Sequence, residues 1–414
     1  MPYVFPGKAW ERGKMRQIKF YLTSWVLLML VGCSAIETTG ELVTGVTSYF
    51  LGGEDNIEPP AELLDYKAEI ELDVLWKESV GVGADDKFLN LDVAVSYGKI
   101  FVADREGLVQ ARDAATGDLI WENDTDYQFS AGPGTGDGAV IFATSNAEVV
   151  AFSLETGEKQ WVSSVSSEVL ANPVIAENSV IIRTTDGKLT ALDEKDGSEL
   201  WTFERSVPAL SIRGTGTPII VGDKVIAGYA NGKLLALRLI DGKNIWETSV
   251  AIPGGRSEIE RLVDLDVDPV ETDGVIFISS YQGGTTAILD LNGDVLWRNK
   301  DVSSYSGLSY DWRYLYVSDT VSHVWQLDQG NGGSLWKQDE LTNRMLSTPV
   351  AYGDYVVVGD FEGYVHWLAV SDGRQLGRIK IASSEINAKP VVVNNIVYIY
   401  AKDGTLSALK ARLF

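Results

Sequence analysis

The sequence predicts an all-β protein whose folded part is an eight-bladed β-propeller of four-stranded antiparallel blades. Three observations predict it. A unit that ends in tryptophan recurs roughly every 40 to 50 residues. Each unit contains short β-branched runs separated by glycine turns, and the two ends of the repeat region supply complementary parts of one last unit. The closing tryptophans are Trp76, Trp121, Trp161, Trp201, Trp246, Trp297 and Trp336.

The clearest unit covers residues 171–201 and predicts four strands. These strands are expected over residues 173–175, 180–184, 189–192 and 199–201. Asp186-Gly187 is expected to supply the positive φ angles of a tight hairpin turn, and Asp196-Gly197 turns the chain again. A sheet this small cannot bury both faces alone, so the units must pack face to face. Closing them into a ring leaves only short exposed edges.

The two ends of the repeat region complete each other. The seventh unit has Gly377 where a tryptophan is expected, and the eighth stops at Phe414 after its third strand. Residues 70–76 (IELDVLW) form an unassigned fourth strand with its own tryptophan. We therefore expect the N-terminal strand to close the last blade, with the propeller covering residues 70–414. Each closing tryptophan is expected to dock against the adjoining blade, because indole rings bury large areas.

Residues 1–32 are expected to be a signal peptide. Arg16 and Lys19 precede an apolar run over residues 20–31. This run is too short to span a bilayer as a helix, and the basic-then-apolar order is typical of secretory signals. The true translation start is expected at either Met1 or Met15.

The apolar run ends in Leu-Val-Gly-Cys, which resembles the bacterial lipobox and implies lipid attachment at Cys33. Cys33 is the only cysteine, so no intrachain disulfide forms; the alternative is a buried free thiol. By the same resemblance, Ser34 implies export to the outer membrane. Residues 33–69 are expected to be a lipid-anchored tether, with one short helix over residues 61–68.

The formal net charge of -23 argues against nucleic-acid partners. Such a field repels phosphate backbones and anionic lipid, so contact with the membrane is expected through the lipid anchor only. High negative charge also favours solubility, which is the simpler explanation for it.

The closing tryptophan and its turns resemble the repeat of quinoprotein-type propellers. One branch of these consists of dehydrogenases that use pyrroloquinoline quinone with calcium, and membership would imply an adjacent cysteine pair and a catalytic aspartate. The chain has one cysteine and two histidines, His323 and His366, each expected within the third strand of its repeat and not as a ligand. The glycine-rich residues 132–136 precede a strand and not a helix, so they are not a phosphate loop.

No paired carboxylates or metal-ligand spacing stand out either, so we expect no enzyme and no cofactor. The alternative is a periplasmic quinoprotein dehydrogenase, or a sensor of a small ligand in the central channel.

The other branch is the BamB family of lipoproteins, which the order of signal, lipobox and compact propeller resembles closely. This resemblance implies a non-catalytic scaffold at the outer membrane, facing the periplasm. It implies binding to BamA and other subunits of the β-barrel assembly machinery, contact with unfolded outer-membrane proteins, and assistance to their folding and insertion. In the family, the connectors that bind BamA carry L-x-L/I-R-G and D-x-D-x-x-P elements. The matching positions here are Leu210, Ile212, Arg213, Asp264 and Asp266.

Loop length points to the same region. The connectors from Trp201 to Pro218 and from Trp246 to Pro269 are longer than the equivalent one that ends at Pro173. They are expected to leave the same face of successive blades, and long loops on a rigid scaffold tend to carry function. Two apolar side chains beside a guanidinium are typical of an interface hot spot. The alternative is that the connectors only cover the propeller face, with Arg213 paired to an aspartate of the second connector.

Overall fold

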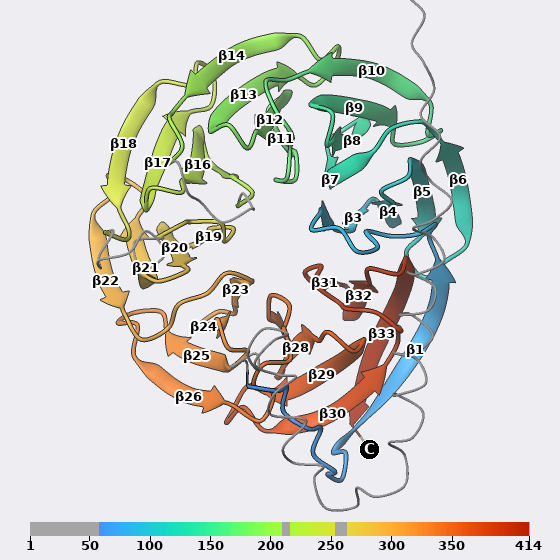
Figure 1. The fold of residues 1–414 in the computed structure, drawn as a ribbon, viewed down its shortest axis with the longest axis vertical. Helices are drawn as coiled ribbons and strands as arrows, with labels where there is room; N and C mark the ends of the chain where they lie inside the picture. The colour runs from blue at the N-terminus through green and yellow to red at the C-terminus, as the bar shows by residue number, and fades with distance from the viewer. Residues whose placement is uncertain (1–57, 209–215, 253–262, 414) are drawn as a thin grey trace, which may run out of the picture. The chain divides into compact units, whose positions relative to one another are not determined.

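The computed structural model describes residues 58–208, 216–252 and 263–413. Within these residues the secondary structure consists of strands, and residues from Pro59 onward form one compact unit. Eight sheets follow one another around a ring, with the first strand of each sheet nearest the centre and the fourth at the rim (Figure 1). This confirms the predicted fold class of an eight-bladed β-propeller. No helix in the described ranges has the length and apolarity to cross a membrane.

The first four blades follow the chain in order. Blade 1 contains β3 (Ala94–Ser96), β4 (Lys99–Ala103), β5 (Leu108–Asp113) and β6 (Leu119–Asp124). Blade 2 contains β7 (Phe129–Thr135), β8 (Ala139–Thr144), β9 (Glu148–Ser153) and β10 (Lys159–Ser164), with β2 (Asn90–Leu91) added in parallel beside β7. Blade 3 contains β11 (Val174–Ala176), β12 (Ser179–Arg183), β13 (Lys188–Asp193) and β14 (Glu199–Glu204). Blade 4 contains β15 (Ile219–Val221), β16 (Lys224–Gly228), β17 (Lys233–Arg238) and β18 (Asn244–Ser249).

The other four blades complete the ring. Blade 5 contains β19 (Val270–Thr272), β20 (Val275–Ser280), β21 (Gly284–Leu289) and β22 (Val295–Asn299). Blade 6 contains β23 (Gly307–Tyr310), β24 (Tyr314–Ser318), β25 (Val324–Asp328) and β26 (Ser334–Gln338). Blade 7 contains β27 (Val350–Tyr352), β28 (Tyr355–Gly359), β29 (Tyr364–Ala369) and β30 (Gln375–Lys380). Blade 8 contains β31 (Val391–Val393), β32 (Ile396–Tyr400), β33 (Thr405–Leu413) and β1 (Ile70–Ser79).

Blade 3 matches the four strands predicted for the clearest unit, with boundaries that differ by up to three residues. One detail of its second hairpin, between β12 and β13, was wrong. Only Gly187 has a positive φ, at 91°, whereas both Asp186 and Gly187 were expected to. The connection between β12 and β13 spans residues 184–187, so a single left-handed residue suffices where a two-residue turn would need two. The glycine-rich residues 132–136 lie largely within β7 and are followed by β8 of the same blade, so they precede a strand and not a helix, as expected.

The closing tryptophans tie each blade to the next, as predicted. Each indole Nε1 donates to a main-chain oxygen of the following blade, at 2.7 to 3.1 Å. Each ring also lies against a turn glycine of that blade with φ between 66° and 79°. The accepting residues are Ala114, Leu154, Glu194, Leu239, Asp290, Gln329 and Val370. The repeat therefore encodes an inter-blade contact that combines apolar burial with one directional bond.

Strand β1 completes blade 8, which confirms the predicted closure. It pairs antiparallel with β33 from Ile70 opposite Leu413 to Ser79 opposite Thr405. Trp76 packs in the core at 8% exposure, and an ion pair between Asp73 and Arg412 joins the same two strands. The two ends of the propeller are thus held in one sheet (Figure 1).

Residues 59–69 lie against blades 6 and 7, and we call this segment the strap. The short helix predicted over residues 61–68 was wrong. The strap's main chain bonds to the propeller instead of to itself: the Ala61 amide donates to the Thr342 oxygen at 2.9 Å, and Arg344 donates to the Ala61 oxygen at 2.9 Å. Arg378 donates to the Leu64 oxygen at 2.5 Å.

Candidate partner-docking face

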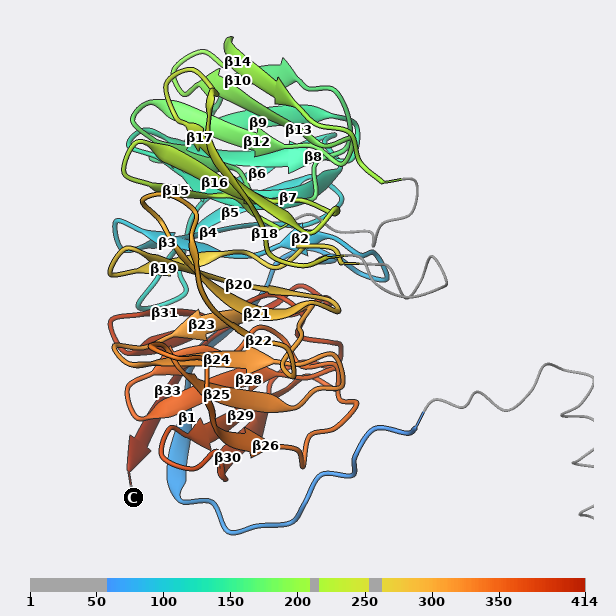
Figure 2. The same cartoon turned by 90° about the vertical axis from the view of Figure 1, so that its left-hand side faces the viewer.

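Two long connectors join blades 3, 4 and 5. The first connector, residues 205–218, leads from β14 to β15, and the second, residues 250–269, leads from β18 to β19. Their described parts lie on the same face of the ring, on the right in Figure 2. Of the predicted site residues, Asp264 and Asp266 are described, whereas Leu210, Ile212, Arg213 and Cys33 lie outside the described residues.

Alternate residues of the second connector are buried in the hydrophobic cores of the ring. Leu265 is 0% exposed and packs with the core of blades 4 and 5, and Val267 is 2% exposed and joins the next core. Aspartates alternate with these apolar residues: Asp264, before Leu265, is buried, and Asp266, between Leu265 and Val267, is half-buried. Two apolar side chains therefore fix the backbone of this D-x-D segment, which limits how far its aspartates can move.

The ends of the two connectors contact each other directly. The Thr217 amide donates to Asp268 Oδ1 at 2.6 Å, and Arg183 Nη1 donates to the Gly216 oxygen at 3.2 Å. Gly216 lies so close to the Val267 carbonyl that a β-carbon there would stand 2.8 Å from its oxygen. The structure thus brings together the described ends of the two segments that the sequence singled out.

One buried arginine faces three carboxylates at this junction. Arg183 is 3% exposed, and burial lowers its pKa, while Tyr229, Asp266, Asp268 and Asp264 oppose that change. Burial, followed by the charge of Asp264, raises the pKa of Asp266 to about 7, and Arg183 acts in the opposite direction. Burial also raises the pKa of Asp268. Among the described residues of the junction, Arg183 therefore faces three carboxylates, and the pKa values of Asp266 and Asp268 are raised.

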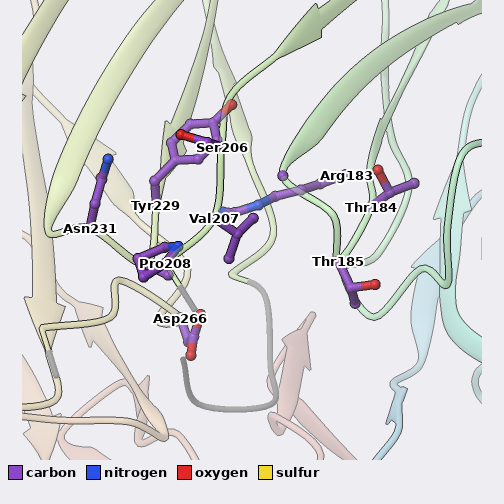
Figure 3. Close-up of a pocket in the computed structure, with 11 residues that line it drawn as sticks. Arg183, Thr184, Thr185, Ser206, Val207, Pro208, Tyr229, Asn231 and Asp266 are labelled. Carbon is purple, nitrogen blue, oxygen red and sulfur yellow. The ribbon is translucent and has the colours of Figure 1, made fainter. Parts of the chain in front are cut away.

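A small pocket opens beside this junction (Figure 3), and we call it the Arg183 pocket. The Arg183 guanidinium lies over the Tyr229 ring, with Cζ 4.8 Å from the ring centroid. Asp266 lies on the far side of the pocket, and Val207 and Pro208 of the first connector line it as well. The pocket therefore lies between blades 3 and 4 and is lined by both connectors.

The two histidines have structural partners. His366 is fully buried in β29, where Nε2 is 3.0 Å from Asp360 Oδ2, and Asp360 also accepts from Arg344. His323 lies one residue before β25, not within it as expected, and its Nδ1 is 2.8 Å from Asp319 Oδ2. In the described ranges, no group of three or more histidine, cysteine or acidic side chains could hold a metal ion.

Sequence reasoning missed Arg183 and Tyr229, although a signal for the arginine exists. In blade 3, Arg183 is the last residue of the second strand, β12, and lies opposite Leu189 on the third strand, β13. Six other blades place alanine, glycine or serine there: Ala103, Ala143, Gly228, Ser279, Ser318 and Gly359. Blade 8 has Tyr400 at this position, so an arginine there departs from the small residues of six blades and from the tyrosine of the seventh.

The fold and site define a class of protein: a propeller of tryptophan-closed repeats, with a polar junction between two connectors on one face. A family model described as outer membrane protein assembly factor BamB matches residues 73–164, 105–338 and 322–412. The BamB of Pseudomonas aeruginosa is 44% identical over 355 residues, covering 86% of this chain and 93% of that protein. The chain belongs to the BamB family of outer-membrane protein assembly factors, as the sequence predicted.

Solved structures agree with this assignment. The crystal structure of BamB from Moraxella catarrhalis matches with a TM-score of 0.74 and 25% identity, covering 82% of this chain and all of that one. The quinohemoprotein alcohol dehydrogenase from Comamonas testosteroni matches with a TM-score of 0.62 and 14% identity, over 83% of this chain and 77% of that one, which shows a shared fold alone. The chain is thus a factor in outer-membrane protein assembly and not an enzyme, as expected.

Proposed function

We propose that this chain is a scaffold lipoprotein of the β-barrel assembly machinery that binds the POTRA region of BamA and assists the folding and insertion of outer-membrane proteins. Family membership supports the assembly role. The observation that carries the binding role is the junction of the two connectors, where Thr217 bonds to Asp268. Because two adjacent blades present one joined surface, a partner meets a preorganised site and loses little entropy in ordering it.

The docking surface in this proposal consists of Leu210, Ile212, Arg213, Asp264 and Asp266. Leu265 and Val267 hold the two aspartates in place by packing below them. The leucine and isoleucine supply apolar anchors, and the charged residues set the orientation of the partner. BamA binding through this surface then brings the propeller to the site where barrel proteins insert.

The test of docking is an affinity measurement with the purified POTRA region of BamA. Arg213→Glu reverses a charge of the proposed surface and Leu210→Ala removes one of its apolar side chains, so each is expected to weaken binding tenfold or more. The matched control is Arg313→Glu, an arginine in the exposed turn between β23 and β24 of blade 6. Unchanged affinity in both surface variants, with folding intact, would remove this surface from consideration.

We further propose that acylation of Cys33 holds the protein at the outer membrane with the propeller in the periplasm. Cys33→Ser is expected to abolish incorporation of labelled palmitate and to release the protein into the periplasmic fraction. If the variant still incorporated palmitate, the proposed attachment site would be wrong. If it lost the palmitate but stayed with the membrane, the proposed anchor would be wrong.

A further inference from the structure

Another long connector lies on the same face of the ring as the first and second connectors. Residues 80–93 lead from β1 of blade 8 to β3 of blade 1 and are as many as those of the first connector. Like the other two, this segment joins the fourth strand of one blade to the first strand of the next, so it runs over the same face. We call it the crossing connector, because its strand β2 crosses the inner edge of blade 2.

The crossing connector is fixed to two blades beyond those that it joins. Strand β2 pairs in parallel with β7, the innermost strand of blade 2, and the Asp92 amide donates to the Gly132 oxygen at 3.0 Å. The side chain of Asn172, two residues before β11 of blade 3, holds both partners. Its Nδ2 donates to Asp92 Oδ2 at 2.7 Å, and its Oδ1 accepts from the Gly132 amide at 2.7 Å. The segment therefore extends from blade 8 to blade 3.

The same series of hydrogen bonds continues into the junction of the first and second connectors. The Asn172 amide donates to Thr217 Oγ1 at 3.3 Å, and the Thr217 amide donates to Asp268 Oδ1 at 2.6 Å. Burial, and then the charge of Asp268, raise the pKa of Asp92, so the two carboxylates lie within range of each other's charge. The crossing connector, the first connector and the second connector thus form one hydrogen-bonded layer.

Phe88 of the crossing connector presents an aromatic ring to solvent from a fixed position. Its side chain is 71% exposed, and Lys402 Nζ lies 5.1 Å from the ring centroid. Lys402 is itself held by an ion pair with Glu385, and its main-chain oxygen accepts from the Asp85 amide at 2.9 Å. A cation over the ring face restrains the ring without covering its other side. Phe88 is therefore an exposed apolar group whose orientation is set before any partner arrives.

Phe88 lies close enough to the bonded layer for one partner to cover both. Only four positions separate it from Asp92, and an extended chain spans at most about 3.6 Å per residue, so their α-carbons lie within about 14 Å. A standard interface buries about 800 Å² on each partner, which corresponds to a patch about 30 Å across. A protein docked on the first and second connectors therefore reaches Phe88 with an interface of ordinary size.

We propose that Phe88 is an aromatic anchor for the same protein that docks on the first and second connectors, and that its ring enters an apolar pocket of the BamA POTRA region. This inference rests on the proposed function and extends the docking face to blades 8 and 1. Aromatic side chains that fill a pocket on the partner carry a large share of the binding free energy. The charged groups of Asp85 and Lys402 beside the ring fit the polar rim of such a contact.

The first test is Phe88→Ala, with thermal stability and affinity for the purified POTRA region as the two readouts. The ring is largely exposed in the free protein, so its removal leaves the Tm nearly unchanged. The bound state loses an anchor, so affinity falls about tenfold or more. Unchanged affinity would overturn the proposal.

The matched control is Tyr97→Ala in blade 1. Tyr97 is 69% exposed, but it lies in the hairpin between β3 and β4, at the opposite end of β3 from the crossing connector. The variant is therefore expected to bind the POTRA region as the wild type does. An equal loss of affinity in both variants would show a general effect of removing an exposed ring and would contradict a specific anchor.

The second test identifies the occupant by photo-crosslinking with purified components. A benzophenone-bearing phenylalanine replaces Phe88 in the full propeller, and the same amino acid replaces Tyr97 in the control. The expected result is a covalent adduct with the POTRA region from position 88 and none from position 97. If position 88 reacts with an unfolded outer-membrane protein but not with the POTRA region, the occupant is a client and the proposal fails.

The pattern of results separates this inference from the proposed function. If Arg213→Glu and Leu210→Ala weaken binding while Phe88→Ala does not, the proposed surface stands and the aromatic anchor fails. If Phe88→Ala weakens binding while the other two variants do not, the anchor stands and the proposed surface fails. A wild-type protein that does not bind the POTRA region at all rejects both.

Discussion

Trp367 on β29 lies directly opposite Gly377 on β30, which reverses the arrangement found in the other blades. Elsewhere the tryptophan is on the fourth strand and faces a smaller residue on the third, as Trp201 faces Ala191. Trp367 is fully buried and packs with the core of blades 7 and 8, where Ile70 lies beside Gly377. Blade 7 thus has no tryptophan on its fourth strand, β30, but carries one on its third strand, β29.

The closure of the propeller explains this reversal. A closing tryptophan docks on the turn glycine between the third and fourth strands of the next blade, as Trp336 docks on Gly373. In blade 8 the third strand, β33, is not followed by such a turn, because its fourth strand β1 comes from the other end of the domain. A tryptophan at position 377 would therefore have no docking turn.

We predict that Trp367→Ala destabilises the fold by about 3 to 5 kcal/mol, since it empties a fully buried site. Gly377→Trp is expected to be at least as harmful, because even a β-carbon there comes within 3.0 Å of Ile70. Urea unfolding followed by tryptophan fluorescence measures both. The double variant, with Trp367→Ala and Gly377→Trp together, should also be less stable than the wild type. Full recovery of the unfolding free energy would show that blade 8 can accept a docking tryptophan.

Two glycines of blade 5 allow ring docking to be separated from backbone strain. Gly293 and Gly274 both have φ of 78°. A β-carbon on Gly293 would lie 2.7 Å from the Trp246 ring, whereas one on Gly274 would meet nothing within 4 Å. Gly274→Ala is thus expected to cost about 1 kcal/mol from strain alone. Gly293→Ala should cost several times more in thermal denaturation, and equal losses would contradict a packing role for the turn glycine.

The stability of the connector junction is expected to depend on pH through Asp266. Its folded-state pKa of about 7 lies above the ordinary value of 3.8, so folding takes up a proton between these values. The raised pKa of Asp266 therefore adds to the free energy of unfolding below about pH 4. This added stability is lost as the pH rises to about 7. Asp92, with a pKa raised to about 6 by burial, adds to the same slope.

Asp266→Asn should therefore flatten part of the decline in unfolding free energy between pH 4 and pH 7, by an amount on the order of a few kcal/mol. Chemical denaturation at a series of pH values measures it. A variant whose pH profile parallels that of the wild type would show that Asp266 ionises normally.

Arg378 is expected to hold the strap in place. It donates to the Leu64 oxygen and stacks over the Tyr66 ring, with Cζ 5.2 Å from the centroid. Arg378→Ala should speed amide hydrogen exchange in residues 59–69 about tenfold or more while leaving the blades unchanged. Lys380→Ala is the control, because this lysine lies over Tyr364 of its own blade and not over the strap. Equal exchange in the two variants would contradict the assignment.

Local residue pattern was enough to predict the repeat, the ring and the docking of the tryptophans. Each of these depends on short-range turn chemistry or on a spacing visible in the chain, as in the Asp-Gly turn that precedes Trp201. The absence of a tryptophan at Gly377 was visible too, but its compensation by Trp367 depends on which strands face each other across the sheet.

The candidate site was predicted only in part, because its contacts join distant positions. Asp264 and Asp266 came from a motif, whereas Arg183 and Tyr229 reach the second connector through the packing of neighbouring blades. The strap was misjudged for a related reason. Its composition allowed a helix over residues 61–68, but arginines from blades 6 and 7 compete for its carbonyl groups.

The pairing of β1 with β33 also sets an order of events during folding. The first strand of the propeller has its ladder partner in the last strand of the described fold, so the ring cannot close until that distant strand is available. Pairing over such a sequence separation is slow, and until it happens the incomplete ring presents open strand edges and uncovered apolar surface. A chain of this kind is therefore most exposed to aggregation until β33 has paired with β1, and a chaperone that binds before that pairing would be most useful.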